Sequence, residues 1–145
     1  MSLLDQVETK SKSFDGTVPP VRVNVQGVDG IGKSTFGADA PSSIFIQAED
    51  GLKFIDNVAR FPVIESWNQL LTQVKTLIEE PHEYKSVVLD TTDAASKFGE
   101  EFVCESNGWS GPQDKQAGYG AFYVAEENAW RKLLQGLNIC FEERG

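Results

Sequence analysis

The sequence predicts an α/β fold in which a parallel sheet is flanked by helices. Short apolar segments typical of strands alternate along the chain with segments whose apolar residues recur at helical spacing. Such alternation favours parallel strands with helices on both faces of the sheet. A glycine-rich turn, residues 27–34, also lies between the first expected strand and the first expected helix. The chain has 145 residues, of which 40% are apolar, so we expect a single globular domain.

Four segments carry strand signals. The first alternates valines with polar residues, the second follows Pro41, and the third ends on Asp90. The fourth, LNICF, follows Gly136, which we expect to end the last helix. The expected strands are residues 21–26, 42–49, 85–90 and 137–141. Before them, residues 1–20 end in Pro19-Pro20 and are expected to form a mobile arm, which leaves residues 21–145 as the domain.

Three longer helices are expected between and after these strands. The first begins after Ser66, which forms a capping box with Gln69, and Pro81 ends it. Apolar residues at helical spacing support each helix: Trp67, Leu70, Leu71, Val74, Leu77 and Ile78; then Ala94, Ala95, Phe98 and Phe102; then Phe122, Ala125, Ala129, Trp130, Leu133 and Leu134.

The glycine-rich turn fits the phosphate-binding pattern G-x-x-x-x-G-K-S/T without a mismatch. Its glycines let backbone N–H groups turn toward phosphates, and Lys33 can reach the β- and γ-oxygens. Ser34 offers a hydroxyl to Mg²⁺, and Thr35 can contact the α-phosphate. The turn therefore predicts a site for ATP with Mg²⁺. Its expected binding residues are Gly27, Asp29, Gly30, Ile31, Gly32, Lys33, Ser34 and Thr35.

Two acidic residues at strand ends complete the expected site. Asp90 closes the apolar strand SVVLD, at the edge where ligands of open α/β sheets bind, so we expect it to hold Mg²⁺ through water. Glu49 ends the second expected strand and could polarise an attacking water. On spacing alone, a surface acid at the end of a strand explains Glu49 equally well.

The segments GVDGIGKST, SIFIQAEDGL and SVVLDTTDAA, in this order, resemble the ATPase core of RecA-like recombinases. They resemble most the phage-encoded RecA-like nucleotide-binding proteins, some of which are associated with single-strand annealing. The resemblance implies Mg²⁺-dependent ATP hydrolysis in DNA recombination or annealing, in the host cytoplasm. It also implies that Glu49 is the general base, acting with Lys33, and that Thr91 is the small hydroxyl residue that follows the metal-side acid.

The same resemblance implies partners. The loop at residues 105–120 falls where RecA-like filaments contact single-stranded DNA, and Trp109 and Tyr119 could stack on bases. RecA-like ATPases complete their active sites across a protomer interface, which predicts a homo-oligomer.

The chain departs from the RecA-like pattern near its end. A glutamine or histidine that senses the γ-phosphate is expected after the fourth strand, where this chain has Glu142 and Glu143. The sheet is thus expected to be incomplete at the C-terminus. We therefore expect ATP binding with slow hydrolysis, no stimulation by single-stranded DNA, and self-association through an open sheet edge.

Two other functions fit part of the sequence. Asp29 precedes the second glycine of the turn, as in thymidylate kinases, but the four arginines form no cluster that could clamp transferring phosphates. A nucleotide-dependent interaction module without turnover is the second alternative.

Composition excludes several classes of protein. A net charge of −9 argues against a protein that coats duplex nucleic acid. No apolar run reaches the roughly 20 residues that a membrane span needs. Cys104 and Cys140 lack the spacing of a disulfide framework or a metal site, so we expect reduced, buried thiols in a cytosolic protein.

Overall fold

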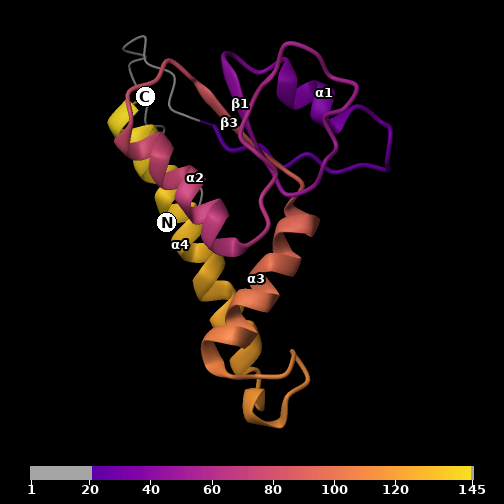
Figure 1. The fold of residues 1–145 in the computed structure, drawn as a ribbon, viewed down its shortest axis with the longest axis vertical. Helices are drawn as coiled ribbons and strands as arrows, with labels where there is room; N and C mark the ends of the chain where they lie inside the picture. Colours follow the sequence, from indigo (N-terminus) through magenta and orange to yellow (C-terminus); the bar gives the residue numbers. More distant parts are fainter. Residues whose placement is uncertain (1–20, 145) are drawn as a thin grey trace, which may run out of the picture.

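A computed structural model describes residues 21–144 of the chain, and it confirms the α/β architecture. Figure 1 shows a small sheet at one end of the molecule and a group of longer helices that extends away from it. In chain order the elements are α1 (Lys33–Ala38), β1 (Ser43–Gln47), β2 (Ala59–Arg60), α2 (Trp67–Glu79), β3 (Ser86–Asp90), α3 (Thr92–Asn107), the 3-10 helix η2 (Lys115–Ala117) and α4 (Ala121–Arg144).

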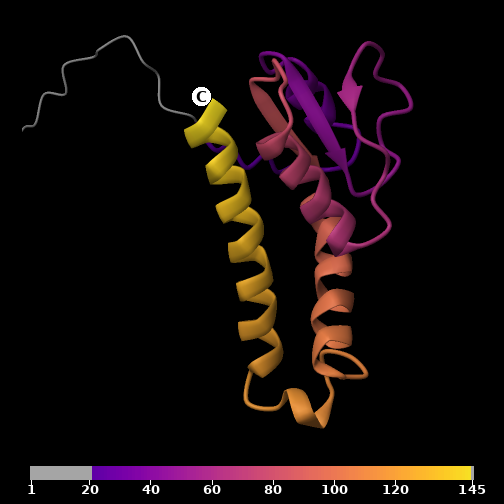
Figure 2. The ribbon, with the colours of Figure 1, turned by 60° about the vertical axis from the view of Figure 1, so that its left-hand side comes forward.

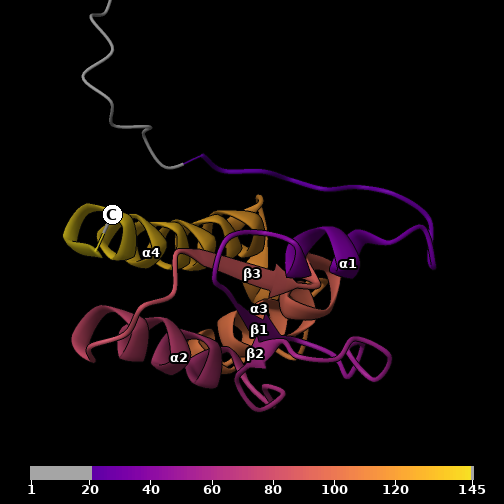
Figure 3. The same cartoon turned by 90° about the horizontal axis from the view of Figure 1, so that it is seen from above.

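The sheet has three parallel strands in the order β2-β1-β3, which follow one another in the view from above in Figure 3. Along β1 and β3 the register pairs Ile44 with Val87 and Gln47 with Asp90. Just beyond β1, the Ala48 N–H donates to the Asp90 carbonyl oxygen at 2.8 Å. The expected strands at 42–49 and 85–90 are therefore confirmed, with ends trimmed by one or two residues.

Helices cover both faces of the sheet, as the alternation predicted. On one face, a Cβ built on Gly37 of α1 would lie 2.9 Å from Val88 Cγ1, so α1 rests directly on β3. On the other face, Ile44 and Ile46 join a core formed with α2, α3 and α4. Alternate residues of β1 thus point to the two helical layers.

The helix α2 forms where its capping residues predicted. The Ser66 Oγ accepts the Gln69 N–H at 3.2 Å, and Gln69 Oε1 in turn accepts the Glu65 N–H at 2.7 Å. This reciprocal pair satisfies donors at the helix start that would otherwise lack partners. The helix buries Trp67 and Leu70 almost completely.

The expected strand at 137–141 is wrong, because α4 continues through Gly136 to Arg144. Leu133, Leu137 and Cys140 extend one apolar stripe at helical spacing, and the Cys140 Sγ lies 3.9 Å from the Val74 carbonyl oxygen. A Cβ on Gly136 would lie 3.0 Å from Val74 Cγ1. The glycine therefore allows α4 to cross α2 closely instead of ending the helix. Figure 2 shows α4 as one continuous helix that runs back from the loop to the level of the sheet.

The expected strand at 21–26 is also wrong. These residues form no strand, and all of them are exposed. The Arg22 guanidinium donates to Asn138 Oδ1 near the C-terminal end of α4, and from there the segment runs to α1 without pairing with β3 (Figure 2). A segment forms a strand only where it pairs with a neighbouring strand. In the described part of the chain β3 is an edge strand, and no strand pairs with its outer side.

Three smaller findings complete the fold. The two-residue strand β2 was not foreseen, while the expected burial of Cys104 and Cys140 is confirmed. The expected N-terminal arm, residues 1–20, lies outside the described residues. Between residues 21 and 144, no helix has the length and apolar character needed to cross a membrane.

We predict that Gly136→Val destabilises the fold by about 1–3 kcal/mol, because the new side chain must displace Val74 at the helix crossing. Chemical denaturation followed by circular dichroism would measure the loss. The control is Gln135→Val, at an exposed neighbouring position of α4 where only helix propensity changes, by about 0.5 kcal/mol. Equal stability of the two variants would show that α4 does not pack closely on α2 at Gly136.

Candidate functional site

The glycine-rich turn lies immediately before α1, beside the sheet edge where β1 and β3 end. Two of its glycines have left-handed backbone conformations, with φ of 77° at Gly30 and 99° at Gly32. Such φ values strain any residue with a Cβ. At Gly27 the reason is different, because a Cβ there would lie 2.8 Å from Ile31 Cγ2. Backbone conformation therefore explains the glycines at residues 30 and 32, and the nearby Ile31 side chain explains Gly27.

Lys33 is folded back over this turn. Its Nζ donates to the carbonyl oxygens of Gly27 at 2.7 Å and Val28 at 3.1 Å, and it lies 3.8 Å from Asp29 Oδ1. The ammonium is thus held over the concave side of the loop by neutral acceptors and one distant, fully exposed carboxylate. Phosphate oxygens would be stronger partners for it, since bonds between two charged groups are shorter and stronger.

Ser34 and Asp90, which are 56 residues apart in the sequence, are brought together at the start of α1 and the end of β3. The Ser34 Oγ donates to Asp90 Oδ2 at 2.6 Å, and Asp90 is only 8% exposed. A hydroxyl and a carboxylate are the oxygen donors that suit Mg²⁺, which takes its other ligands from phosphates and water. Across residues 21–144 no group of three or more His, Cys, Asp or Glu side chains could hold a metal. Ser34 and Asp90 thus offer two oxygen ligands of the kind that Mg²⁺ accepts.

Glu49 lies two residues beyond β1 and is exposed, beside the start of α3. Its Oε1 accepts a hydrogen bond from the Thr91 hydroxyl at 3.1 Å. Thr91 follows Asp90 directly and is the N-cap of α3, where its Oγ1 accepts the Ala94 N–H at 3.3 Å. The structure thus brings Glu49 next to the Ser34–Asp90 pair. The contact between Thr91 and Glu49 was not foreseen, although Thr91 carries the sequence signal of a helix cap.

The other expected binding residues lie on the outside of the same turn. Asp29, Ile31 and Thr35 are all exposed, and Ile31 is 66% exposed. The Thr35 carbonyl oxygen accepts the Asp39 N–H at 3.1 Å within α1. The eight expected residues therefore lie together in the turn and in the first three residues of α1, and most of them are exposed.

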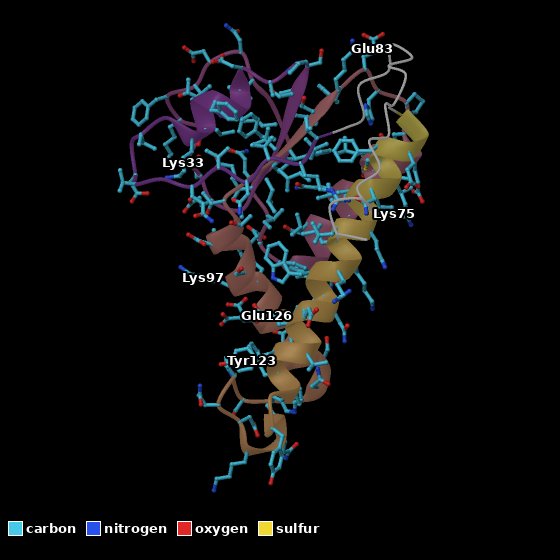
Figure 4. The ribbon with its side chains drawn as sticks, turned by 180° about the vertical axis from the view of Figure 1, so that it is seen from behind. Lys33, Lys75, Glu83, Lys97, Tyr123 and Glu126 are labelled. Carbon is cyan, nitrogen blue, oxygen red and sulfur yellow. The ribbon has the colours of Figure 1, made fainter. Side chains whose placement is uncertain are left out.

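The loop expected to contact DNA lies at the opposite end of the molecule. Residues 105–107 belong to α3, and the rest of the 105–120 segment connects α3 to α4 through η2. Figure 4 shows Lys33 beside the sheet and Tyr123 near this loop, at the far end of α3. Trp109 packs against the core, whereas Tyr119 is fully exposed. Of the two aromatic residues expected to stack on bases, only Tyr119 presents its whole ring to solvent.

Acidic side chains dominate the helices next to this loop. Burial, with Glu100 of α3 as a second cause, raises the pKa of the Glu126 carboxyl on α4. Burial also raises the pKa of the Cys104 thiol, and the carboxylates of Glu100 and Asp114 add to this effect. The surroundings of the loop thus offer little attraction for a polyanion.

The loop itself is ordered by Asp114. Its Oδ2 accepts the N–H and the hydroxyl of Ser110, each at 2.8 Å, and its Oδ1 accepts the Gln116 N–H at 2.8 Å. The Ser110 N–H, followed by the Gln116 N–H, holds the pKa of the Asp114 carboxyl below its ordinary value. A lowered pKa means that the folded loop stabilises the ionised form of the Asp114 carboxyl.

We predict that Asp114→Ala increases amide hydrogen exchange several-fold at Ser110 and Gln116, because both amides lose their acceptor. In the wild type the carboxylate contributes fully above its ordinary pKa of 3.8, and this contribution is lost as the pH falls through the lowered folded value. Exchange measured by NMR tests both effects. Glu105→Ala, which removes an exposed acid at the end of α3, is the control. Unchanged exchange in Asp114→Ala would show that the loop is ordered by other contacts.

Comparison with known proteins finds a similar protein and a matching family. The SPbeta prophage-derived uncharacterized protein YorG of Bacillus subtilis (strain 168) is 24% identical over 140 residues, which is 94% of this chain. Those residues are 42% of YorG, so the chain spans less than half the length of this relative. No solved structure matches the chain.

A protein family described as "AAA domain" matches residues 19–142. The match includes the glycine-rich turn, β1 with Glu49 beyond it, and β3 with Asp90 at its end. It does not single out the RecA-like group that the sequence resembles. Since it extends over most of the chain, the protein belongs to the AAA domain family.

Proposed function

We propose that the protein binds ATP with Mg²⁺ at the glycine-rich turn. It hydrolyses the bond between the β- and γ-phosphates with Glu49 as general base. The observation that carries this proposal is the 2.6 Å contact between Ser34 Oγ and Asp90 Oδ2. It joins the phosphate-binding turn to the strand-end acid, which is the arrangement that a nucleotide with its metal requires. Membership of the AAA domain family supports the nucleotide-binding part of the proposal.

Binding begins with an exchange of partners at Lys33. The ammonium leaves the carbonyl oxygens of Gly27 and Val28 and turns to the β- and γ-phosphate oxygens. The first N–H groups of α1 have no acceptor within the helix, so they are available to the phosphates. The exposure of Thr35 leaves its hydroxyl accessible to the α-phosphate.

Ser34 and Asp90 hold the metal in this proposal. The Ser34 hydroxyl would bind Mg²⁺ directly, and the Asp90 carboxylate would hold it through water. When bound, Mg²⁺ neutralises the charge that develops on the phosphate oxygens. The burial of Asp90 strengthens its interaction with a cation, because less water screens it.

Glu49 accepts the proton of the attacking water. Because its side chain is exposed and lies beside Asp90 and Thr91, water can approach it from solvent while the phosphates lie on the turn. A carboxylate in hydrogen-bond reach of the nucleophile contributes typically about 10²–10⁴-fold to a rate.

We further propose that the ATPase acts in phage DNA recombination or single-strand annealing, as a homo-oligomer. The resemblance of three segments to RecA-like proteins and the similarity to a prophage-derived protein support this role. The loop at 105–120 is the proposed place of contact with single-stranded DNA. Because the helices beside it are acidic, the contact is proposed through stacking of a base on the exposed Tyr119 and not through the phosphates.

The two alternative functions differ in what happens to the bound ATP. A thymidylate-kinase-like enzyme transfers the γ-phosphate to a nucleoside monophosphate, whereas an interaction module binds ATP without cleaving it. Steady-state ATP turnover with no addition, with thymidylate and with single-stranded DNA separates the three. We expect phosphate release that does not require thymidylate, and formation of thymidine diphosphate would overturn the proposal in favour of the kinase.

We predict that Lys33→Ala weakens ATP–Mg²⁺ binding at least about tenfold, because charge-assisted hydrogen bonds worth roughly 1.5–3 kcal/mol each are lost. Titration calorimetry would measure the affinity. Lys75→Ala is the control, since Lys75 is an exposed lysine on α2 that pairs only with Glu79 among the ion pairs described. Undiminished affinity in Lys33→Ala would refute the site.

We predict that Glu49→Gln keeps the ATP affinity of the wild type but lowers hydrolysis by about 10²-fold or more, because an amide cannot accept the proton. Calorimetry and phosphate release, measured on the same protein, would separate binding from turnover. The control is Asp50→Asn, which removes the neighbouring exposed carboxylate that pairs with Lys53. Hydrolysis at the wild-type rate would mean that Glu49 is a surface acid beyond β1.

A further inference from the structure

We infer that Thr91 is a positioning residue that holds the Glu49 carboxylate in place for the proposed hydrolysis. This inference rests on the proposed function and concerns the same site. It assigns a task in turnover to a residue whose position alone, at the start of α3, would indicate only a helix cap.

The hydrogen bonds of Thr91 have a fixed direction. A hydroxyl has one proton to donate and lone pairs that accept. The Thr91 Oγ1 accepts the Ala94 N–H at 3.3 Å, which fixes the side chain as the cap of α3. Its single proton is then free for Glu49 Oε1, 3.1 Å away. Because a carboxylate oxygen can only accept, the Thr91 hydroxyl is the donor in this contact.

Glu49 depends on such a partner. It lies beyond the last residue of β1, on an exposed bend, where a glutamate side chain would otherwise sample several rotamers. The neighbouring backbone is fixed, since the Ala48 N–H donates to the Asp90 carbonyl oxygen and the Gly51 N–H to that of Glu49. The side chain is therefore the part of Glu49 that needs to be held, and the Thr91 hydroxyl is the group that holds it in the structure.

The position of Thr91 also sets where Glu49 is held. Asp90, the preceding residue, contacts Ser34 in the phosphate-binding turn. Consecutive residues at the end of β3 thus contact the two halves of the site, Asp90 the metal-side hydroxyl and Thr91 the proposed base. This arrangement places Glu49 relative to the phosphates through one short stretch of backbone.

Substitutions at residue 91 can distinguish a residue that positions Glu49 from one that only caps α3. Serine at residue 91 retains both the donor and the acceptor, whereas valine has nearly the same shape as threonine and retains neither. Aspartate is as good an N-cap as threonine, but it places a second carboxylate against Glu49 and donates no proton. Full turnover in Thr91→Asp would therefore show that the residue only caps α3.

The test uses Thr91→Ser, Thr91→Val and Thr91→Asp in the 145-residue chain. Single-turnover ATP hydrolysis, ATP affinity by calorimetry and thermal unfolding are measured for each. We expect Thr91→Val to lower the rate about tenfold or more with ATP affinity within about threefold, since a misplacement of about 1 Å can cost as much as 10²-fold. Thr91→Ser should restore most of the rate. Thr91→Asp should unfold near the wild-type temperature and still be as slow as Thr91→Val.

Ser66→Ala is the matched control, because Ser66 caps α2 in the same way and lies outside the site. It should lose stability as Thr91→Val does and keep the wild-type rate. A wild-type rate in Thr91→Val, or full recovery of the rate in Thr91→Asp, would overturn the inference.

The double variant Thr91→Val with Glu49→Gln separates this inference from the proposed function. If Thr91 acts through Glu49, adding Thr91→Val to Glu49→Gln costs no further rate. A further tenfold loss would show that Thr91 acts elsewhere, which overturns the inference alone. A wild-type chain that hydrolyses bound ATP no faster than Glu49→Gln would overturn the proposed function and the inference together.

Discussion

The parallel register between β1 and β3 is the constraint on which the core and the candidate site both depend. It sets Gln47 opposite Asp90, so Glu49 and Thr91 leave the sheet side by side. Parallel strands end at the same edge, where ligands of open α/β sheets bind. A slip of one residue would turn Ile44 and Ile46 away from the core and would separate Asp90 from Ser34. Hydrophobic packing on one face therefore stabilises the geometry of the polar groups at the edge.

The fold was predictable from the sequence where its signals are local. The Ser66 cap, the helical spacing of the α2 core residues and the apolar strand ending on Asp90 each determine an element with little help from the rest of the chain. The strands expected at residues 21–26 and 137–141 were wrong, because tertiary contacts decide the conformation of these segments. The alternating valines pair with no strand, and Gly136 serves a close crossing with Val74. The strand β2 is too short for any periodicity to appear.

The candidate site was predictable in part for the same reason. The glycine-rich turn is a continuous motif, and its left-handed glycines explain the pattern directly. The pairing of Ser34 with Asp90 was expected from chemistry, because each is a donor for the same metal. The contact of Thr91 with Glu49 was not, since it requires the register of two strands that sequence spacing does not give. The packing of Trp109 against the core likewise depends on how α3 and α4 come together.

The helix α3 connects the two ends of the molecule. Its N-cap, Thr91, lies beside Glu49, and its C-cap, Gly108, has the left-handed conformation that starts the loop toward α4. Its 16 residues span about 24 Å, and Gly99 lets it pack closely against Trp67. By lever geometry, a tilt of about 5° about the loop end would carry Thr91 about 2 Å, which is enough to break its bond to Glu49. A change of a few degrees in the direction of α3 at the loop would therefore displace the partner of the carboxylate directly, without a relay of rearranging side chains between them.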